Sequence, residues 1–278
     1  MMTHAVPPPR LPVRDRAALP DPAGGGGVSP MLTRLAAERA TGVLEREHGT
    51  LHLADGHVVH AESPFAPGLA DLLLAHGTLA ADAWQQAVER ADEEHGAGRL
   101  LVEAGLVARG ALEICHLGAL YDAGYFALAP SSTPGRFHYG TGHLLGAVRP
   151  VTVAELERET LRRRALLHRL WPQPLADTAP LLRTAPGAAP VPATAPDARQ
   201  RAVLALVDGV RTAPDIARAL GRRAFPTLAD VRRLAAAGLV AAKPPPAAPD
   251  PPPGIALPPV TDPDITLLKR LRDALEAL

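Results

Sequence analysis

Proline-rich segments set the main constraint on how this chain folds. Proline occupies 31 of 278 positions, and most copies lie in residues 1–28, 172–196 and 244–261. Proline lacks an amide hydrogen and has a fixed φ, so such segments favour extended linkers over packed structure. We therefore expect a disordered N-terminal tail and two Pro-rich linkers that separate a large module, a small module and a terminal helix. These three parts are residues 29–171, 197–243 and 262–278.

The large module carries the signature of a β-meander. Ser29 suits the N-cap of a first helix. Residues 41–61 then alternate hydrophobic and polar side chains between glycine-containing breaks, which predicts three strands. Asp55-Gly56 predicts a two-residue hairpin loop, because a type I′ turn needs positive φ at both positions. With a further short strand in 135–142, we expect an α+β fold built on an antiparallel meander.

Three histidines near this turn raise the question of a metal site. Pairing outward from the turn sets His52 opposite Val59 and Leu51 opposite His60. Because side chains alternate between the faces of a sheet, we expect His60 on one face and His52 and His57 on the other. Ligands of a tetrahedral zinc ion must converge on one point. We therefore predict no metal site, no catalytic residue and no cofactor.

An internal repeat follows the meander. Residues 71–84 align without gaps on residues 99–112, so that Gly77 matches Gly105 at a period of 28. In each copy the pattern predicts that a helix ends at the glycine, that a hydrophobic residue (Leu79 or Val107) follows, and that a new helix then starts. Two copies are too few for a solenoid. They predict a small helical insertion, at about 77–115.

Cys115 and His116 lie side by side in a helix expected from Val107 to about Leu128. Adjacent residues on a helix point about 100° apart, so the pair does not suit a Cys-His dyad. We interpret Cys115 as a small core residue. As the single cysteine of the chain, it also excludes an intramolecular disulfide framework.

A charged amphipathic helix is expected over 153–171. Its acidic residues come early and its arginines late, which complements the helix dipole. Glu159 and Arg163 can pair at i, i+4. The helix fits either a solvated surface or a docking surface.

Several of these motifs together resemble the PATAN family. The matching residues are TGVLE (41–45), GTLHLADGHVVHAES (49–63), GLADLLL (68–74) and GALYDAGYFALAPSSTPGRFHYG (118–140). The resemblance covers about residues 30–145, and the repeated insert is also similar to the helical repeats of type II secretion ATPases. It implies a protein-interaction module of bacterial signalling proteins without catalytic residues. A receiver domain, which follows in many relatives, is not recognisable in this sequence.

The small module reads as three short helices and a strand start, an arrangement that looks like a winged helix-turn-helix. Thr212 with Asp215, and Thr227 with Asp230, resemble capping boxes that open the second and third helices. Proline begins at Pro244, which makes a two-stranded wing doubtful. Four arginines in and before the third helix suit DNA phosphates. They are Arg222, Arg223, Arg232 and Arg233.

The terminal segment predicts an amphipathic helix at the end of a proline tether. Four leucines recur at helical spacing and form one apolar stripe. An isolated helix of this length is marginal in water, so we expect it to dock on a partner or on the large module. The partner-binding residues are Leu268, Leu271, Leu275 and Leu278.

Charge and hydropathy indicate the setting in which the chain works. Residues 31–172 hold 13 basic and 17 acidic side chains, whereas residues 197–243 hold nine basic and four acidic ones. We find no apolar run of about 18 residues and no signal-peptide core, so we expect a cytoplasmic protein without a membrane partner.

Two functional hypotheses stay open on the sequence. The first is a non-enzymatic transcriptional regulator, whose PATAN-like module receives a protein signal and whose winged helix binds double-stranded DNA. The second is a signalling adaptor that binds only proteins. A small-molecule substrate is not expected in either case.

Overall fold

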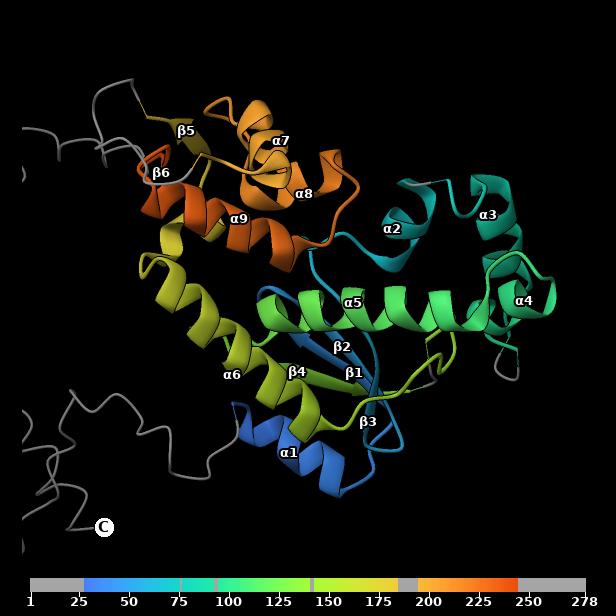
Figure 1. Ribbon diagram of the computed structural model, residues 1–278. Coiled ribbons are helices and arrows are strands. Elements are labelled where there is room, and N and C mark those ends of the chain that lie inside the picture. Colours follow the sequence, from blue (N-terminus) through green and yellow to red (C-terminus); the bar gives the residue numbers. More distant parts are fainter. Residues whose placement is uncertain (1–27, 76, 93–94, 141–142, 185–194, 245–278) are drawn as a thin grey trace, which may run out of the picture. The chain divides into compact units, whose positions relative to one another are not determined.

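The computed structural model describes residues 28–75, 77–92, 95–140, 143–184 and 195–244 (Figure 1). The N-terminal tail and the terminal helix predicted at 262–278, with its four leucines, lie outside these residues. Within them the chain is of α+β class, as predicted, with a four-stranded antiparallel sheet, a two-stranded sheet and helices around both.

The meander forms as the sequence predicts. Its strand order is β3-β2-β1-β4, with every neighbouring pair antiparallel. Asp55 and Gly56 have φ of 48° and 76°, the left-handed values of the expected turn between β2 and β3. The strands are β1 (Gly42–Arg46), β2 (Gly49–Ala54), β3 (His57–Glu62) and β4 (Arg136–Tyr139).

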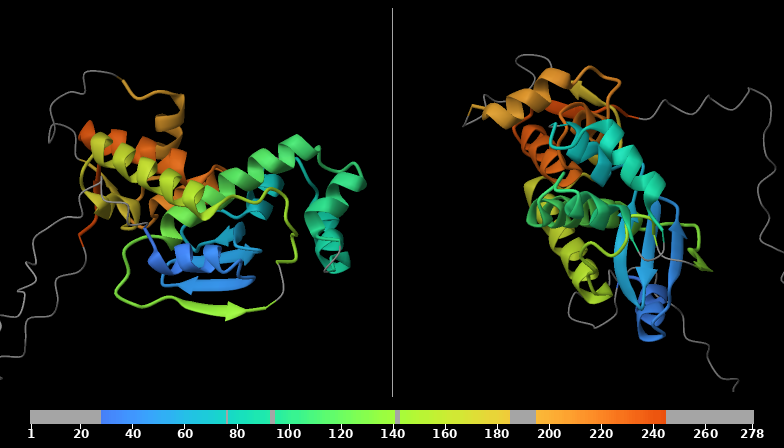
Figure 2. Two further views of the ribbon diagram at one scale, coloured as in Figure 1. Left: turned by 90° about the horizontal axis from the view of Figure 1, so that it is seen from below. Right: turned by 90° about the vertical axis from the view of Figure 1, so that its right-hand side faces the viewer.

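Three helices cover this sheet. They are α1 (Pro30–Ala37), α5 (Arg109–Ala127) and α6 (Val153–Leu170). Helix α1 begins as predicted, with the Ser29 hydroxyl accepting from the Leu32 amide. Helix α5 packs on β2 and β3, and α6 packs on α5 (Figures 1 and 2). Gly124 permits this close approach, because a Cβ there would lie 2.7 Å from a Leu156 methyl group.

The repeat is visible in the backbone of the helical insertion. Gly77 and Gly105 both have positive φ, at 64° and 68°. The Leu79 amide donates to the Leu73 carbonyl, and 28 residues later the Val107 amide makes the equivalent bond to Leu101. Leu79 and Val107 are both buried in a second, smaller hydrophobic core. The helices of this region are α2 (Leu69–Ala75), α3 (Ala81–Arg90) and α4 (Ala97–Glu103).

The C-terminal region starts earlier than the proline content suggests. The sequence predicts a linker over 172–196, but residues 174–183 form a 3-10 helix and a strand that pairs with the last described strand. Short edge strands tolerate flanking prolines, which explains why composition hides them. The elements are η1 (Pro174–Asp177), β5 (Leu181–Arg183), α7 (Ala198–Leu206), α8 (Ala213–Ala219), α9 (Ala224–Ala236) and β6 (Val240–Ala242).

One of the two predicted capping boxes is wrong. The Thr212 box opens α8 as expected. Helix α9, however, begins three residues before Thr227, whose hydroxyl donates to the Arg223 carbonyl instead. The Asp122 carboxylate of α5 accepts the Phe225 amide at 3.0 Å and satisfies the first turn of α9 from outside. A long-range contact therefore replaces the local cap.

The C-terminal region and the sheet region share one hydrophobic core. Leu120 and Leu156 belong to the same buried cluster as Ile216, Leu228 and Leu234. The described residues from 28 to 243 belong to a single compact unit. No helix in the part of the chain that the structure describes is long and apolar enough to cross a bilayer.

Candidate functional sites

A β-bulge determines the geometry of the first site. Next to the turn the register is the expected one, with Leu53 opposite Val58. The register then shifts, so that His52 is opposite His60 and Val59 is the extra residue of β3. Directly opposed residues share a face, so the prediction that His52 and His60 lie on opposite faces is wrong.

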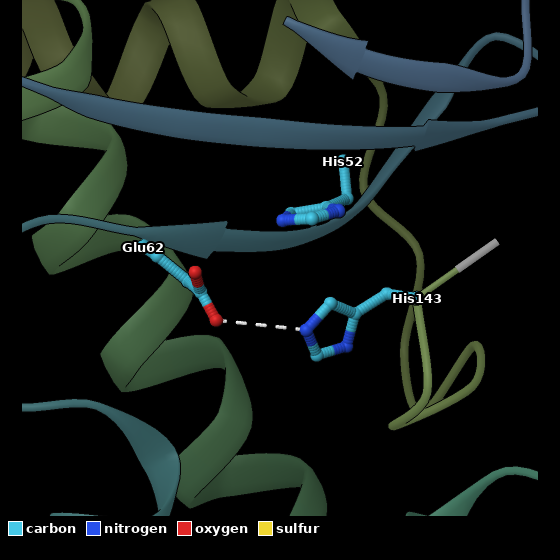
Figure 3. A group of neighbouring side chains, drawn as sticks. All are labelled: His52, Glu62 and His143. Atoms are coloured by element: carbon cyan, nitrogen blue, oxygen red, sulfur yellow. Dashed lines mark ion pairs between the residues drawn. The ribbon is translucent and has the colours of Figure 1, made fainter. Parts of the chain in front are cut away.

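Two further side chains complete a His/Glu cluster, which consists of His52, His60, Glu62 and His143. Figure 3 shows three of its members, His52, Glu62 and His143. The Glu62 Oε1 atom lies 3.5 Å from Nε2 of His143 and 3.5 Å from Nε2 of His60. The His143 ring stacks on His60 with centroids 4.1 Å apart and meets His52 edge-on at 4.5 Å. The Leu145 amide donates to His143 Nδ1 at 3.1 Å, which fixes the orientation of that ring. His57, at the turn, is exposed and outside the cluster.

Burial and mutual contacts lower the pKa of two of the imidazoles and of the carboxylate in this cluster. Burial, reinforced by the neighbouring His143 and His60, lowers the pKa of His52 to about 4. Burial also lowers the pKa of His60. Contacts with His143 and His60 lower the pKa of Glu62. Two ring nitrogens, Nε2 of His52 and Nδ1 of His60, are buried without a hydrogen-bond partner among the described residues.

A cavity of about 450 Å³ opens beside the cluster. His60, Glu62 and His143 form part of its wall, together with Trp84 of α3 and Arg218 of α8. The Arg218 guanidinium donates to the Pro64 carbonyl and so joins α8 to the segment after β3. The cavity therefore gives the cluster access to small ligands.

His116 lies behind His60 and is fully buried, with ring centroids 5.9 Å apart. Its Nε2 donates to the Val59 carbonyl at 2.9 Å, at the bulge itself. Burial lowers its pKa to about 4. Cys115 is partly buried against the second core, in keeping with its interpretation as a packing residue.

The arginines predicted to contact DNA have different surroundings in the structure. Arg232 is 3% exposed, and its guanidinium forms two 2.7 Å bonds with the Asp177 carboxylate of η1. The predicted phosphate contact by Arg232 is therefore wrong, because its side chain points into the protein. Arg223 and Arg233 are exposed, while Arg222 is half-buried.

The exposed arginines border a cleft of about 650 Å³ between α5, α6 and α9, which we call the arginine cleft. Its charged lining includes Arg162, Arg199, Arg223 and Arg233, together with Glu159, which pairs with Arg162 at 2.6 Å. Its apolar lining includes Ile114, Leu117, Tyr121, Leu166, Phe225 and Pro226. The predicted i, i+4 pair occurs at its edge, where Arg163 Nε lies 2.7 Å from Glu159. The buried Arg163 also pairs with Asp122 at 2.7 Å and lies over the Phe225 ring.

Sequence reasoning missed Glu62, His143, Asp122 and Asp177. Glu62 and Asp122 lie within stretches that resemble the PATAN family, but no motif marks any of the four as a site residue. Each acquires its role from a partner on another part of the chain. Glu62 follows His60 at the i+2 spacing that places two strand residues on one face, which was the one available signal. The other three carried none.

Comparison with known proteins finds no matching family model, no matching curated protein and no matching solved structure. The resemblance to the PATAN family and the winged-helix interpretation therefore stay predictions.

Proposed function

We propose that this chain is a non-enzymatic regulatory adaptor that binds protein partners and does not read duplex DNA. The observation that carries the proposal is the burial of α9, the helix that would enter the major groove in a winged-helix protein. Nine of its 13 residues are buried, and Arg232 pairs with Asp177 inside the protein.

A recognition helix must present a continuous polar face to the base edges. Helix α9 packs against α6, α7, α8 and η1, so most of its circumference is occupied. Of the arginines predicted on DNA, Arg223 and Arg233 remain accessible. Both line the arginine cleft, which also has an apolar lining. These surroundings favour the binding of a peptide over the binding of a DNA phosphate backbone.

The arginine cleft favours an acidic amphipathic segment of a protein partner. An apolar lining takes the hydrophobic face of a helix, and basic side chains complement acidic side chains beside it. Ile114 is 71% exposed at this cleft. Large apolar side chains that are exposed beside a groove are typical of interaction surfaces. The PATAN resemblance implies the same class of function.

The competing hypothesis is a transcriptional regulator, which the basic excess of residues 197–243 favours. It requires duplex binding through Arg222, Arg223 or the exposed Arg233, without the buried side chains of α9. The two hypotheses therefore differ in the macromolecule that occupies the arginine cleft.

Site-specific photo-crosslinking in the cells that naturally produce the protein tests the adaptor proposal. A photoreactive residue at position 114 should capture a distinct protein, because Ile114 lies in the arginine cleft. Val210, a similarly branched side chain that is 75% exposed outside the cleft, is the matched control position. The crosslink at 114 should disappear when Arg223→Glu and Arg233→Glu are added. Equal capture at both positions, or crosslinks to DNA at 114, would count against the proposal.

A further inference from the structure

The adaptor proposal makes no use of the His/Glu cluster, and this inference is independent of it. We propose that His52, Glu62 and His143 bind one divalent transition-metal ion of the zinc type. One ligand atom from each residue lies within 4.8 Å of the other two. Two imidazoles and a carboxylate are a donor set that zinc accepts.

The spacing is close to that of a tetrahedral site. Metal–ligand bonds of about 2.0–2.2 Å place the donor atoms about 3.3–3.6 Å apart. The Glu62 Oε1 and His143 Nε2 atoms are already 3.5 Å apart. His52 and Glu62 are fixed on the paired strands β2 and β3, so side-chain rotation alone must close the remaining gap (Figure 3).

An unpartnered ring nitrogen also suits a metal. A ligand must offer a free lone pair, so imidazoles must be uncharged and carboxylates ionised. Nε2 of His52 is buried with no hydrogen-bond partner among the described residues, and a metal ion could accept its lone pair. The His60 ring stacks on the His143 ring and so helps to hold His143 in place.

The fourth coordination position would face the cavity. Glu62 and His143 belong to its wall, whereas His52 approaches from the sheet. A site with three protein ligands and one open position admits water or an exogenous donor. The chemical class of ligand for this cavity is therefore a small oxygen or nitrogen donor, held by the ion.

Metal binding would alter the segment that carries His143. Its Nδ1 accepts the Leu145 amide, so the ring proton resides on Nε2 in the metal-free protein. When Nε2 coordinates the metal, it releases that proton to solvent, and Nδ1 takes up a proton from solvent. The Nδ1–H group and the Leu145 N–H group, both donors, then face each other. The Leu145 amide must turn away, which couples the metal to the segment that leads to α6.

The test uses the full chain without a histidine tag, stripped with chelator and then titrated with Zn²⁺ alone. Calorimetry and elemental analysis should find one equivalent bound. The single changes His52→Ala, Glu62→Gln and His143→Ala should each weaken binding at least about 100-fold. His57→Ala, on the exposed turn of the same hairpin, should bind as the unchanged protein does.

Ring-nitrogen NMR of the same samples identifies the ligand atoms and does not depend on comparing variants. Zn²⁺ should shift Nε2 of His52 and Nε2 of His143, and should leave both nitrogens of His57 unchanged. Circular dichroism confirms that each variant is folded before its affinity is compared. Absence of stoichiometric Zn²⁺ binding would overturn the proposal, as would binding that persists in all three folded variants.

Discussion

Replacing Arg232 with alanine is expected to lower the free energy of unfolding by about 3–5 kcal/mol, the cost of leaving one partner of a buried ion pair uncompensated. The Asp177 carboxylate would lose both of its 2.7 Å bonds to the guanidinium. The Trp171 carbonyl would also lose a donor. Urea unfolding followed by circular dichroism measures the change.

Arg233→Ala is the matched control for this experiment. Arg233 is the next residue of α9, is exposed and pairs with Asp230 at 3.0 Å. Asp230 is buried, but it keeps Arg199 as a second partner at 3.5 Å, and the Arg233 side chain is about half exposed. Removing Arg233 should therefore cost less than removing Arg232, whose side chain and partner are both buried. Similar losses for the two variants would mean that Arg232 is not inside the protein, and the account of α9 would fail.

Acidification is expected to remove about 2 kcal/mol of stability by pH 5 and about 3 kcal/mol by pH 4 through His116 alone. Its pKa is lowered from 6.5 to about 4 because the ring is buried. The unfolded chain therefore binds a proton over this range that the folded chain excludes. Stability is full above pH 6.5 and falls as the pH drops toward 4.

The variant His116→Gln isolates this contribution. A glutamine amide can donate to the Val59 carbonyl as the ring does, but it does not titrate. Urea unfolding between pH 7 and pH 4, with chelator present, should show a flatter pH dependence for this variant. His57→Gln, which changes an exposed histidine, controls for the effect of the substitution itself. If His116→Gln shows the same pH dependence as the unchanged protein, the His116 ring is not buried.

Local sequence rules account for much of the fold. The turn at Asp55-Gly56 follows from the φ values it requires, and those values occur. The glycines of the repeat likewise follow a local rule, because each occupies a helix end that needs positive φ. Gly77 and Gly105 accordingly have similar φ values. The Thr212 box depends on residues three apart, which a sequence displays directly.

Features that depend on distant partners could not be predicted in this way. Nothing in the alternation of β3 shows that Val59 is an extra residue, because its cause lies partly in α5, where His116 binds the Val59 carbonyl. The start of α9 depends on Asp122, 103 residues earlier in the chain. The sequence does not distinguish an arginine that pairs with a buried carboxylate from one that contacts a phosphate. Arg232, which pairs with Asp177, is such a case.

If the protein is an adaptor, as we propose, α9 is enclosed by the rest of the protein and is unavailable to DNA. Fluorescence anisotropy of the full chain with a labelled mixed-sequence duplex at low salt tests it most directly. We predict no saturable binding of the duplex. The anisotropy should not change in the Arg223→Ala, Arg233→Ala double variant, because these arginines line the arginine cleft and do not bind DNA. Salt-sensitive saturable binding that both substitutions weaken across all sequences would contradict the claim and favour a transcriptional regulator.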